Sequence, residues 1–220
     1  MLNLLFPAVC NGCSEQLQSF ENVLCTECRQ NIPLSCFHRS GDESMKNIFY
    51  GRIPVQAATS LFRFQKKGIT QQLLHNLKYR GQKQISDFLG KWLGSELSEI
   101  AEYKKIDLVI PVPLQKNKLR RRGYNQVSGF GREIAAALGV PFREDVLIKA
   151  SKTHSQVFKT RLSRYGSEKI FQITSTEALE NRHILLVDDI VTTGATLENC
   201  ANQILAAKDC RLSLATMAVA

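Results

Sequence analysis

Hydrophobic and polar positions alternate along most of the chain with the periods of strands and helices. Alternating side chains predict a strand within residues 55–65, and apolar residues at helical spacing predict helices near 69–77 and 85–100. Further along, the pattern predicts a strand over 106–110, a helix over 126–138, a strand over 140–148, a strand over 184–187, a helix over 195–207 and a strand over 211–218. Strands and helices in alternation are typical of an α/β domain whose parallel sheet is flanked by helices.

Three segments depart from this pattern. Residues 1 to about 40 are rich in cysteine and show little periodicity. Residues 41–52 look like a loop or linker, because Gly, Asp, Ser and Asn recur there. Residues 149–169 are polar and basic, and an irregular segment of that length inside a compact domain is often functional. We therefore predict a small module over residues 1–42 and an α/β domain over residues 43–220.

The charge balance suggests the kind of partner. Basic residues number 29 against 20 acidic ones, a net charge of +9, which favours phosphates, nucleic acid or an acidic protein surface but also fits a merely basic protein. No apolar run approaches the roughly 18 residues needed to cross a bilayer. The apolar start lacks a basic region before it, so we expect no signal peptide, no membrane insertion and a cytoplasmic location.

Five of the seven cysteines precede residue 37, and four of them form two pairs with a spacing of two residues. Zn²⁺ prefers four thiolates in a tetrahedron, and such pairs are typical of a structural zinc site. The predicted ligands are Cys10, Cys13, Cys25 and Cys28. Free or disulfide-bonded thiols are the alternative, and Cys36 or His38 lies near enough to replace one ligand. Cys200 and Cys210 have apolar neighbours, and we expect them to be buried bystanders.

The segment 184–197 predicts a phosphate site. Four apolar residues indicate a buried strand, Asp188 and Asp189 follow at its carboxyl end, and a turn rich in Thr and Gly over 192–196 opens a helix. Free amides at a helix start favour an anion, whereas the two carboxylates suit sugar hydroxyls or a metal ion. An ordinary loop with an acidic helix cap is the alternative. Together these features indicate a site for ribose 5-phosphate.

This string resembles the phosphoribosyl pyrophosphate signature of type I phosphoribosyltransferases. The chain as a whole resembles the ComF family of competence-associated proteins, which join a zinc knuckle to a phosphoribosyltransferase domain. The resemblance rests on the four paired cysteines, Leu77-Lys78-Tyr79-Arg80-Gly81, Pro111-Val112-Pro113, Arg120-Arg121-Arg122-Gly123-Tyr124-Asn125-Gln126, Thr153 with Gln156, and the phosphate loop. It implies a type I phosphoribosyltransferase-like fold with a small N-terminal zinc module of four cysteines.

The resemblance also implies roles for particular residues. Asp188 and Asp189 would take the ribose hydroxyls, and the 5-phosphate would lie on Thr192, Thr193, Gly194, Ala195 and Thr196. The pyrophosphate, with Mg²⁺, would be held by Pro113, Arg120, Arg121 and Arg122, although a solvated basic loop is the alternative there. Asp188, Asp189, Arg122 and Arg161 form the expected catalytic set, with Arg161 in a flexible loop. Lys78 and Tyr79 are further candidates for the cleft, and Asn125 and Gln126 for capping the next helix or bridging to the substrate.

Two functions follow as expectations. The first is a phosphoribosyltransferase associated with DNA uptake in competence, which displaces pyrophosphate from phosphoribosyl pyrophosphate with a nitrogen nucleophile. The second is a non-catalytic protein of transformation that handles single-stranded DNA through the phosphate pocket and a basic surface. A sensor of a small phosphoribosyl ligand is a third reading. Expected partners are therefore phosphoribosyl pyrophosphate or a ribose 5-phosphate group, single-stranded DNA and the competence machinery.

Overall fold

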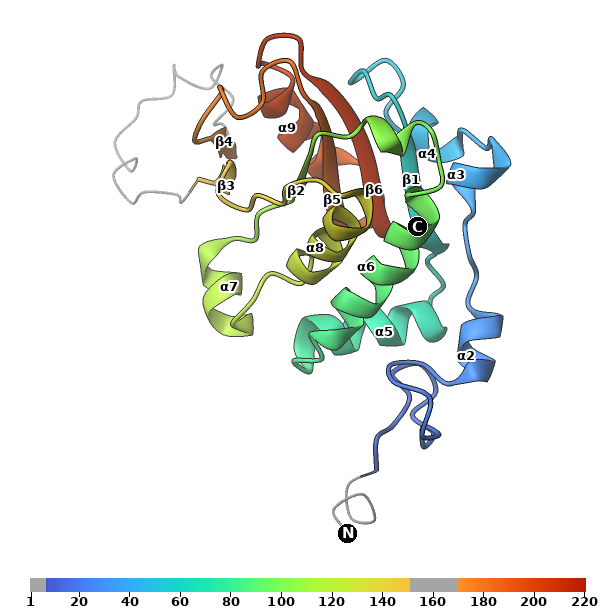
Figure 1. Ribbon diagram of the computed structural model, residues 1–220. Helices are drawn as coiled ribbons and strands as arrows, with labels where there is room; N and C mark the ends of the chain where they lie inside the picture. Colours follow the sequence, from blue (N-terminus) through green and yellow to red (C-terminus); the bar gives the residue numbers. More distant parts are fainter. Residues whose placement is uncertain (1–6, 151–169) are drawn as a thin grey trace.

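The computed structural model describes residues 7–150 and 170–220, and a four-stranded parallel sheet lies at its centre (Figure 1). The order of the strands is β1-β6-β5-β2, and every neighbouring pair is parallel. These strands are β1 (Ala58–Arg63), β2 (Leu108–Pro111), β5 (His183–Val191) and β6 (Arg211–Val219). A short antiparallel pair, β3 (Leu147–Lys149) and β4 (Phe171–Ile173), lies beside the sheet. The predicted parallel sheet is confirmed.

Helices cover both faces of the sheet (Figure 1). One face carries α5 (Ile69–Tyr79), α6 (Gln84–Leu97) and α8 (Ser128–Leu138), and the other carries α9 (Ala195–Ile204). Successive side chains of a strand point to opposite faces, so β5 contributes Leu185 and Val187 to one hydrophobic cluster and Ile184 and Leu186 to the other. The shorter helices are α2 (Thr26–Asn31), α3 (Phe37–Ser40), α4 (Ser44–Asn47), the 3₁₀ helix η1 (Tyr103–Lys105) and α7 (Lys116–Arg122).

Two predicted strand boundaries differ from the structure. β5 does not end at residue 187 but continues through both aspartates to Val191. The cause is β6, which runs beside β5 and pairs Asp188 with Thr216 and Val191 with Val219. The strand predicted over 140–148 is confirmed only at its end, in β3, with a single bridge from Phe142 to Val109.

The prediction of a loop or linker over residues 41–52 missed a short, partly buried helix. The segment contains α4, and both Met45 and Phe49 are completely buried. Two large apolar residues four positions apart lie on one side of a helical turn, and here they pack against the cluster that contains Leu197. The polar residues around them, such as Asp42, Lys46 and Asn47, concealed this pattern.

The cysteine-rich segment packs against the α/β part of the chain. Leu17, Val23 and Leu24 belong to the same hydrophobic cluster as Leu73 and Leu77 of α5. Apolar side chains before residue 42 thus share a core with those after it, and the division of the chain near residue 42 stays a prediction.

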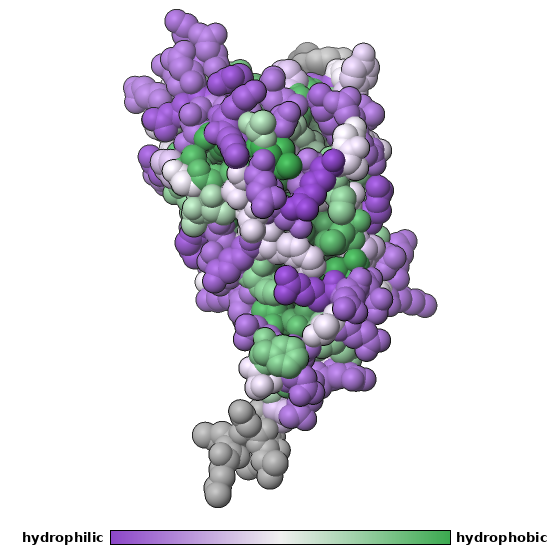
Figure 2. All heavy atoms as spheres, turned by 45° about the vertical axis from the view of Figure 1, so that its right-hand side comes forward, coloured by the Kyte–Doolittle hydropathy of each residue, from purple (hydrophilic) through white to green (hydrophobic). Residues whose placement is uncertain are grey.

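Most of the surface in one view is hydrophilic, with hydrophobic residues exposed in smaller patches between (Figure 2). Among the described residues, no helix combines the length and the apolar character needed to cross a membrane.

Candidate functional site

Two adjacent aspartates, Asp188 and Asp189, lie in the second half of β5. Asp188 is 8% exposed and Asp189 is 6% exposed. The backbone N–H of Asp189 donates to Oδ1 of Asp188 at 2.8 Å. Burial, followed by the negative charge of Asp189, raises the pKa of Asp188 to about 8. The raised pKa favours the protonated form of Asp188 when no cation is near.

Asp189 joins three segments that are distant in the sequence. Its Oδ2 accepts from Nζ of Lys78 at 2.9 Å and from Nε2 of Gln126 at 2.8 Å. Oε1 of Gln126 in turn accepts from Nη1 of Arg122 at 2.7 Å. The sequence left open a helix cap or a bridge to the substrate for Gln126. In the structure its side chain links Arg122 to Asp189, the carboxylate that was expected to bind the sugar.

The phosphate loop follows β5 and surrounds a small pocket of about 60 Å³ lined by Asp188 and residues 190–197. Gly194 has a φ of +77° and lies directly before the first residue of α9. The backbone N–H groups of Gly194 and Thr196 form no hydrogen bond with the described residues. Thr192, Thr193 and Thr196 are exposed. The loop thus offers amides and hydroxyls at a helix start to an anion, as the sequence predicted.

A cleft of about 310 Å³ adjoins this pocket and shares Asp188, Thr192 and Thr196 with it. Four basic residues are among those that line the cleft: Lys78, Lys118, Arg122 and Lys149. Asp189, Pro113 and Gln126 line it as well. The carboxylates therefore face a cavity in which positive charge predominates, which suits a ligand that carries several phosphate charges.

The predicted pyrophosphate residues divide into two groups. Pro113 and Arg122 line the cleft, whereas Arg120 and Arg121 do not. The reason is that residues 116–122 form a helix, α7, rather than the predicted loop, so consecutive arginines point in different directions. Lys, Leu and Arg favour helix, and Gly123 ends it with a φ of +75°. Arg161 lies outside the described residues.

The end of α5 is fixed against the segment that leads from α7 to α8. The hydroxyl of Tyr124 donates to the backbone carbonyl of Leu77, and the guanidinium of Arg122 lies 5.3 Å from the ring centroid of Tyr79. The amide of Asn125 donates to the carbonyl of Val112 at 3.1 Å. These contacts hold Lys78 beside Asp189, so Lys78 lines the cleft, while Tyr79 is 62% exposed at its edge.

Arg52 contacts the phosphate loop and was not among the predicted site residues. It donates to the backbone carbonyl of Thr193 at 3.0 Å. No motif or local pattern marks this arginine, and the segment that carries it looked like a linker.

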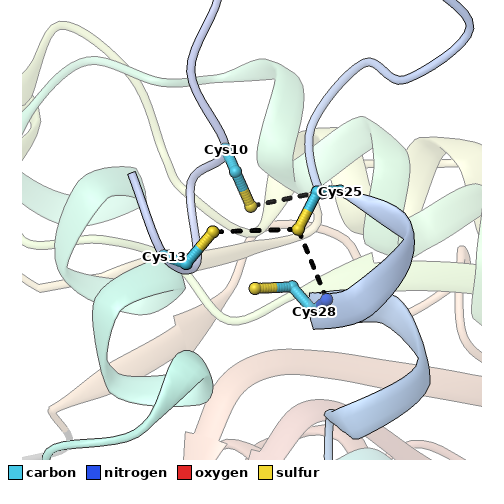
Figure 3. A group of neighbouring side chains, drawn as sticks. All are labelled: Cys10, Cys13, Cys25 and Cys28. Carbon is cyan, nitrogen blue, oxygen red and sulfur yellow. Dashed lines mark hydrogen bonds between the residues drawn. The ribbon is translucent and has the colours of Figure 1, made fainter. Parts of the chain in front are cut away.

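The four paired cysteines form a compact cluster (Figure 3). Their sulfur atoms all lie within 4.8 Å of one another, and those of Cys13 and Cys25 are 3.7 Å apart. A zinc ion with four thiolates at about 2.3 Å would place the sulfurs about 3.8 Å apart, so the arrangement fits a tetrahedral site. Cys36 and His38 are not part of the cluster, and the ring of His38 is hydrogen bonded to Thr59 and Glu96 instead.

Backbone amides favour the thiolate form of Cys10, one member of this cluster. Sγ of Cys10 accepts from the N–H groups of Gly12 at 3.3 Å and Cys25 at 3.2 Å. Burial opposes ionisation of Cys10, but the backbone donors outweigh it and lower the pKa of the thiol to about 7. Thiolates are the form that binds metals, so the cluster could hold a metal ion. Cys200 is a fully buried residue of α9, as expected, and Cys210 is only half-buried.

The family model described as "Phosphoribosyl transferase domain" matches residues 128–219, which include α8, the two aspartates, the phosphate loop and the last strand. Together with the parallel sheet and the loop geometry, this match defines a protein with the type I phosphoribosyltransferase fold. Among solved structures, an adenine phosphoribosyltransferase aligns with 68% of the chain and 75% of its own length at 23% identity, with a TM-score of 0.39.

Curated relatives cover most of the chain. "Competence protein F" of Haemophilus influenzae is 23% identical over 89% of the chain and 83% of its own length. "Competence protein ComFC" of Streptococcus pneumoniae is 27% identical over 82% of the chain and 80% of its own length. "Competence protein ComFC" of Bacillus subtilis is 26% identical over 90% of the chain and 78% of its own length. This similarity to three competence proteins, together with the match to the phosphoribosyltransferase domain, supports membership of the chain in the ComF/ComFC family.

Proposed function

We propose that this protein binds phosphoribosyl pyrophosphate together with Mg²⁺ and that it acts in the uptake of DNA during natural competence. The observation that carries the proposal is the position of the unpaired amides of Gly194 and Thr196 beside two buried aspartates. Amides bind phosphate and carboxylates bind sugar hydroxyls, so the pair of features matches the two parts of a ribose 5-phosphate. The names of the curated relatives support the link to competence.

Each part of the ligand has a place in the cleft. The 5-phosphate lies in the loop over residues 192–196, and the ribose hydroxyls face Asp188 and Asp189. The pyrophosphate extends toward Arg122 and Pro113, with Lys118 nearby, since these residues line the same cavity. Arg120 and Arg121 add positive charge on the outer surface of α7.

Carboxylate oxygens are the protein ligands that Mg²⁺ prefers, so the aspartates fit this ion. Oδ2 of Asp189 already accepts from Lys78 and Gln126, which leaves Asp188 and the oxygens of the ligand as the better places for it. When bound, the ion neutralises negative charge on the pyrophosphate.

If the protein is an enzyme, the reaction is a pentosyl transfer. A nitrogen nucleophile forms a bond to C1 of the ribose while the bond from C1 to the pyrophosphate oxygen breaks, and pyrophosphate leaves with the electron pair. The chain supplies fixed positive charge where negative charge develops, at Arg122 and Lys118. Asp188 and Asp189 orient the sugar and stabilise positive charge on its ring.

For the cysteine cluster we propose a structural Zn²⁺ ion held by Cys10, Cys13, Cys25 and Cys28. Four protein ligands leave no position for water, so the ion stabilises the fold and does no chemistry. The assignment is supported by the sulfur distances and by the shared hydrophobic cluster with α5.

The second candidate function is the handling of single-stranded DNA without turnover. Helix α7 carries five basic residues, and none of its side chains is buried. Tyr79 is exposed beside it and can stack on a base. A basic helix next to an exposed ring suits a backbone of phosphates with unpaired bases.

Binding measurements separate the two functions. We expect the parent protein to bind phosphoribosyl pyrophosphate with Mg²⁺, and the double variant Asp188→Asn/Asp189→Asn to lose this affinity by about tenfold or more. Asp209→Asn is the matched control, because Asp209 is exposed and is not among the residues that line the cleft. Binding of single-stranded DNA, measured across a salt series, should not change in the double variant. Equal affinity of the parent and the double variant for the sugar phosphate would contradict the proposal.

Release of pyrophosphate decides between enzyme and binding protein. The parent is incubated with phosphoribosyl pyrophosphate, Mg²⁺ and a panel of nitrogen bases, and free pyrophosphate is measured. Release that depends on both a base and the aspartates establishes transfer. Absence of release across the panel, with intact binding, favours the DNA-handling function.

A further inference from the structure

Arg52 lies on the outer side of the phosphate loop, in the segment that follows α4. Its guanidinium has three acceptors: the carbonyl of Thr193 at 3.0 Å, the carbonyl of Ile48, and Oε2 of Glu198 at 2.7 Å. Thr193 and Glu198 lie on either side of the start of α9, whereas Ile48 belongs to the same segment as Arg52. Arg52 therefore ties the N-terminal part of the chain to the loop that is proposed to hold the 5-phosphate.

The contact to Thr193 fixes the direction of one peptide group. The carbonyl of Thr193 and the N–H of Gly194 belong to the same peptide, and in a trans peptide they point in opposite directions. Arg52 holds the carbonyl on its own side of the loop. Arg52 lines a separate hollow of about 490 Å³ and is not among the residues around the phosphate pocket. The N–H of Gly194 is therefore directed away from Arg52, toward the phosphate pocket.

Packing on the same side supports this orientation. A Cβ added to Gly194 would lie 2.7 Å from the ring of Phe49 and 3.1 Å from Nη2 of Arg52, so the loop is pressed against this segment. Phe49 is completely buried, and the guanidinium of Arg52 lies 5.6 Å from its ring centroid. Because Gly194 has a φ of +77° and no side chain, its peptide could rotate if the carbonyl were released. A rotated peptide would direct an oxygen, not a donor, at a phosphate.

We infer that Arg52 is a positioning residue that directs the amide of Gly194 at the ligand. The inference rests on the proposed function, because it assigns a cause to the orientation of a phosphate-binding amide. Arg52 itself does not touch the ligand. Substitution of Arg52 should weaken binding of the 5-phosphate. Ribose 5-phosphate is therefore the probe, because it carries this phosphate but no pyrophosphate.

The test compares Arg52→Ala and Arg52→Lys with the control Arg39→Ala. Arg39 is a half-exposed arginine of the same N-terminal part that pairs with Glu99 at 3.6 Å and does not contact the loop. Affinity for ribose 5-phosphate is measured by calorimetry. We expect Arg52→Ala to lose about tenfold or more, since one oriented donor to an anion is removed. Arg39→Ala should bind like the parent.

The lysine variant separates positioning from stability. An ammonium can donate to the carbonyl of Thr193 but cannot bridge three acceptors as a guanidinium does, so Arg52→Lys should recover part of the affinity. Glu198→Gln, which weakens only one contact of Arg52, should lose less than Arg52→Ala. If Arg52→Ala does not fold, these two variants carry the comparison.

Each result has a distinct meaning. Affinity of Arg52→Ala equal to that of the parent would overturn the role of Arg52 and leave the proposed function intact. An equal loss in Arg39→Ala would overturn it too, because the effect would then be one of general charge. Failure of the parent to bind ribose 5-phosphate or phosphoribosyl pyrophosphate would remove the proposed function itself.

Discussion

Single residues of the site make the stability of the fold depend on pH. Burial and the charge of Asp189 raise the pKa of Asp188 to about 8. Between the ordinary aspartate pKa and this value, the native state keeps a proton that the unfolded chain has lost. The contribution of Asp188 to the free energy of unfolding is therefore complete below the ordinary aspartate pKa. It decreases as the pH rises toward about 8, by up to about 1.4 kcal/mol per pH unit.

Two histidines act in the opposite direction. Burial lowers the pKa of His38 and of His183, so the unfolded state binds their protons more readily and stability from them increases with pH. That contribution is complete once the pH exceeds the ordinary histidine value of about 6.5. From there to about pH 8, the thiol of Cys10 still acts against Asp188, because its pKa is lowered to about 7. The contribution of Asp188 is therefore measured as the difference between the parent and a variant that lacks this carboxyl group.

We predict that the change in the free energy of unfolding from about pH 7 to about pH 8, measured with urea, is more negative in the parent than in Asp188→Asn. The difference arises because the amide does not ionise, whereas Cys10 contributes equally to both proteins. Asp209→Asn, on the surface, should keep the slope of the parent. An unchanged slope in Asp188→Asn would show that the proton is not held at this residue.

Residue identity at the site was predictable only where a motif carries it. Asp188, Asp189 and the threonines lie in a continuous string whose chemistry can be read directly. Lys78 and Gln126 were candidates, but their contact with Asp189 depends on how α5 and α8 pack. Arg52 had no such signal, because its partners Thr193 and Glu198 lie more than a hundred residues further along the chain.

At the scale of elements, the close approach of α6 and α8 depends on small residues. A Cβ on Gly90 of α6 would lie 2.6 Å from the carbonyl oxygen and 2.8 Å from Cα of Phe130 in α8. Both are backbone atoms, so the two helices would have to move apart. Alanine in place of glycine stabilises a helix by up to about 1 kcal/mol, which is less than the strain expected from this close approach.

Gly90→Ala should therefore destabilise the protein by about 1–3 kcal/mol. Ser95→Ala, at an exposed position of the same helix, is the control and should be neutral or slightly stabilising. The measurement is equilibrium unfolding in denaturant. A Gly90→Ala variant as stable as the parent would mean that the helices adjust without strain.

Periodicity predicted the elements that have a continuous apolar pattern. It failed where contacts with other elements determine the bounds or where no apolar pattern exists. The helices α5 and α6 follow directly from leucines and isoleucines at helical spacing, and the structure confirms them. The length of β5 depends on β6 beside it, so its end could not be read from residues 184–191 alone. No side chain of the helix α7 is buried, and therefore no apolar periodicity marked it.

At the scale of the whole molecule, the cysteine cluster and the α/β part share one hydrophobic cluster. Cys10 and Cys28 pack with Leu73 and Leu77, and the side chain of Asn76 donates to the carbonyl of Asn11 at 3.2 Å. If the cluster binds Zn²⁺, the binding energy therefore contributes to the stability of the entire fold rather than to a separate module.

We predict stoichiometric zinc in the purified protein and a lower melting temperature after chelation, with a single unfolding transition before and after. Gly12→Ala should give a similar but smaller effect, because its Cβ would lie 2.9 Å from the sulfur of Cys28. Elemental analysis and calorimetry test this. Two separate transitions would instead support an independent module before residue 42, and a metal-free protein with the same melting temperature would exclude the zinc site.

The strand order has a consequence for synthesis. β6 is the last strand in the sequence, yet it lies between β1 and β5, and within the described sheet these two strands are joined only through it. While a ribosome is still adding residues 211–219, β1 has no neighbouring strand, although all four cysteines were made long before. Metal binding can thus precede completion of the sheet. In a nascent chain, the gap between β1 and β5 would stay open until β6 has been synthesised and has paired with both.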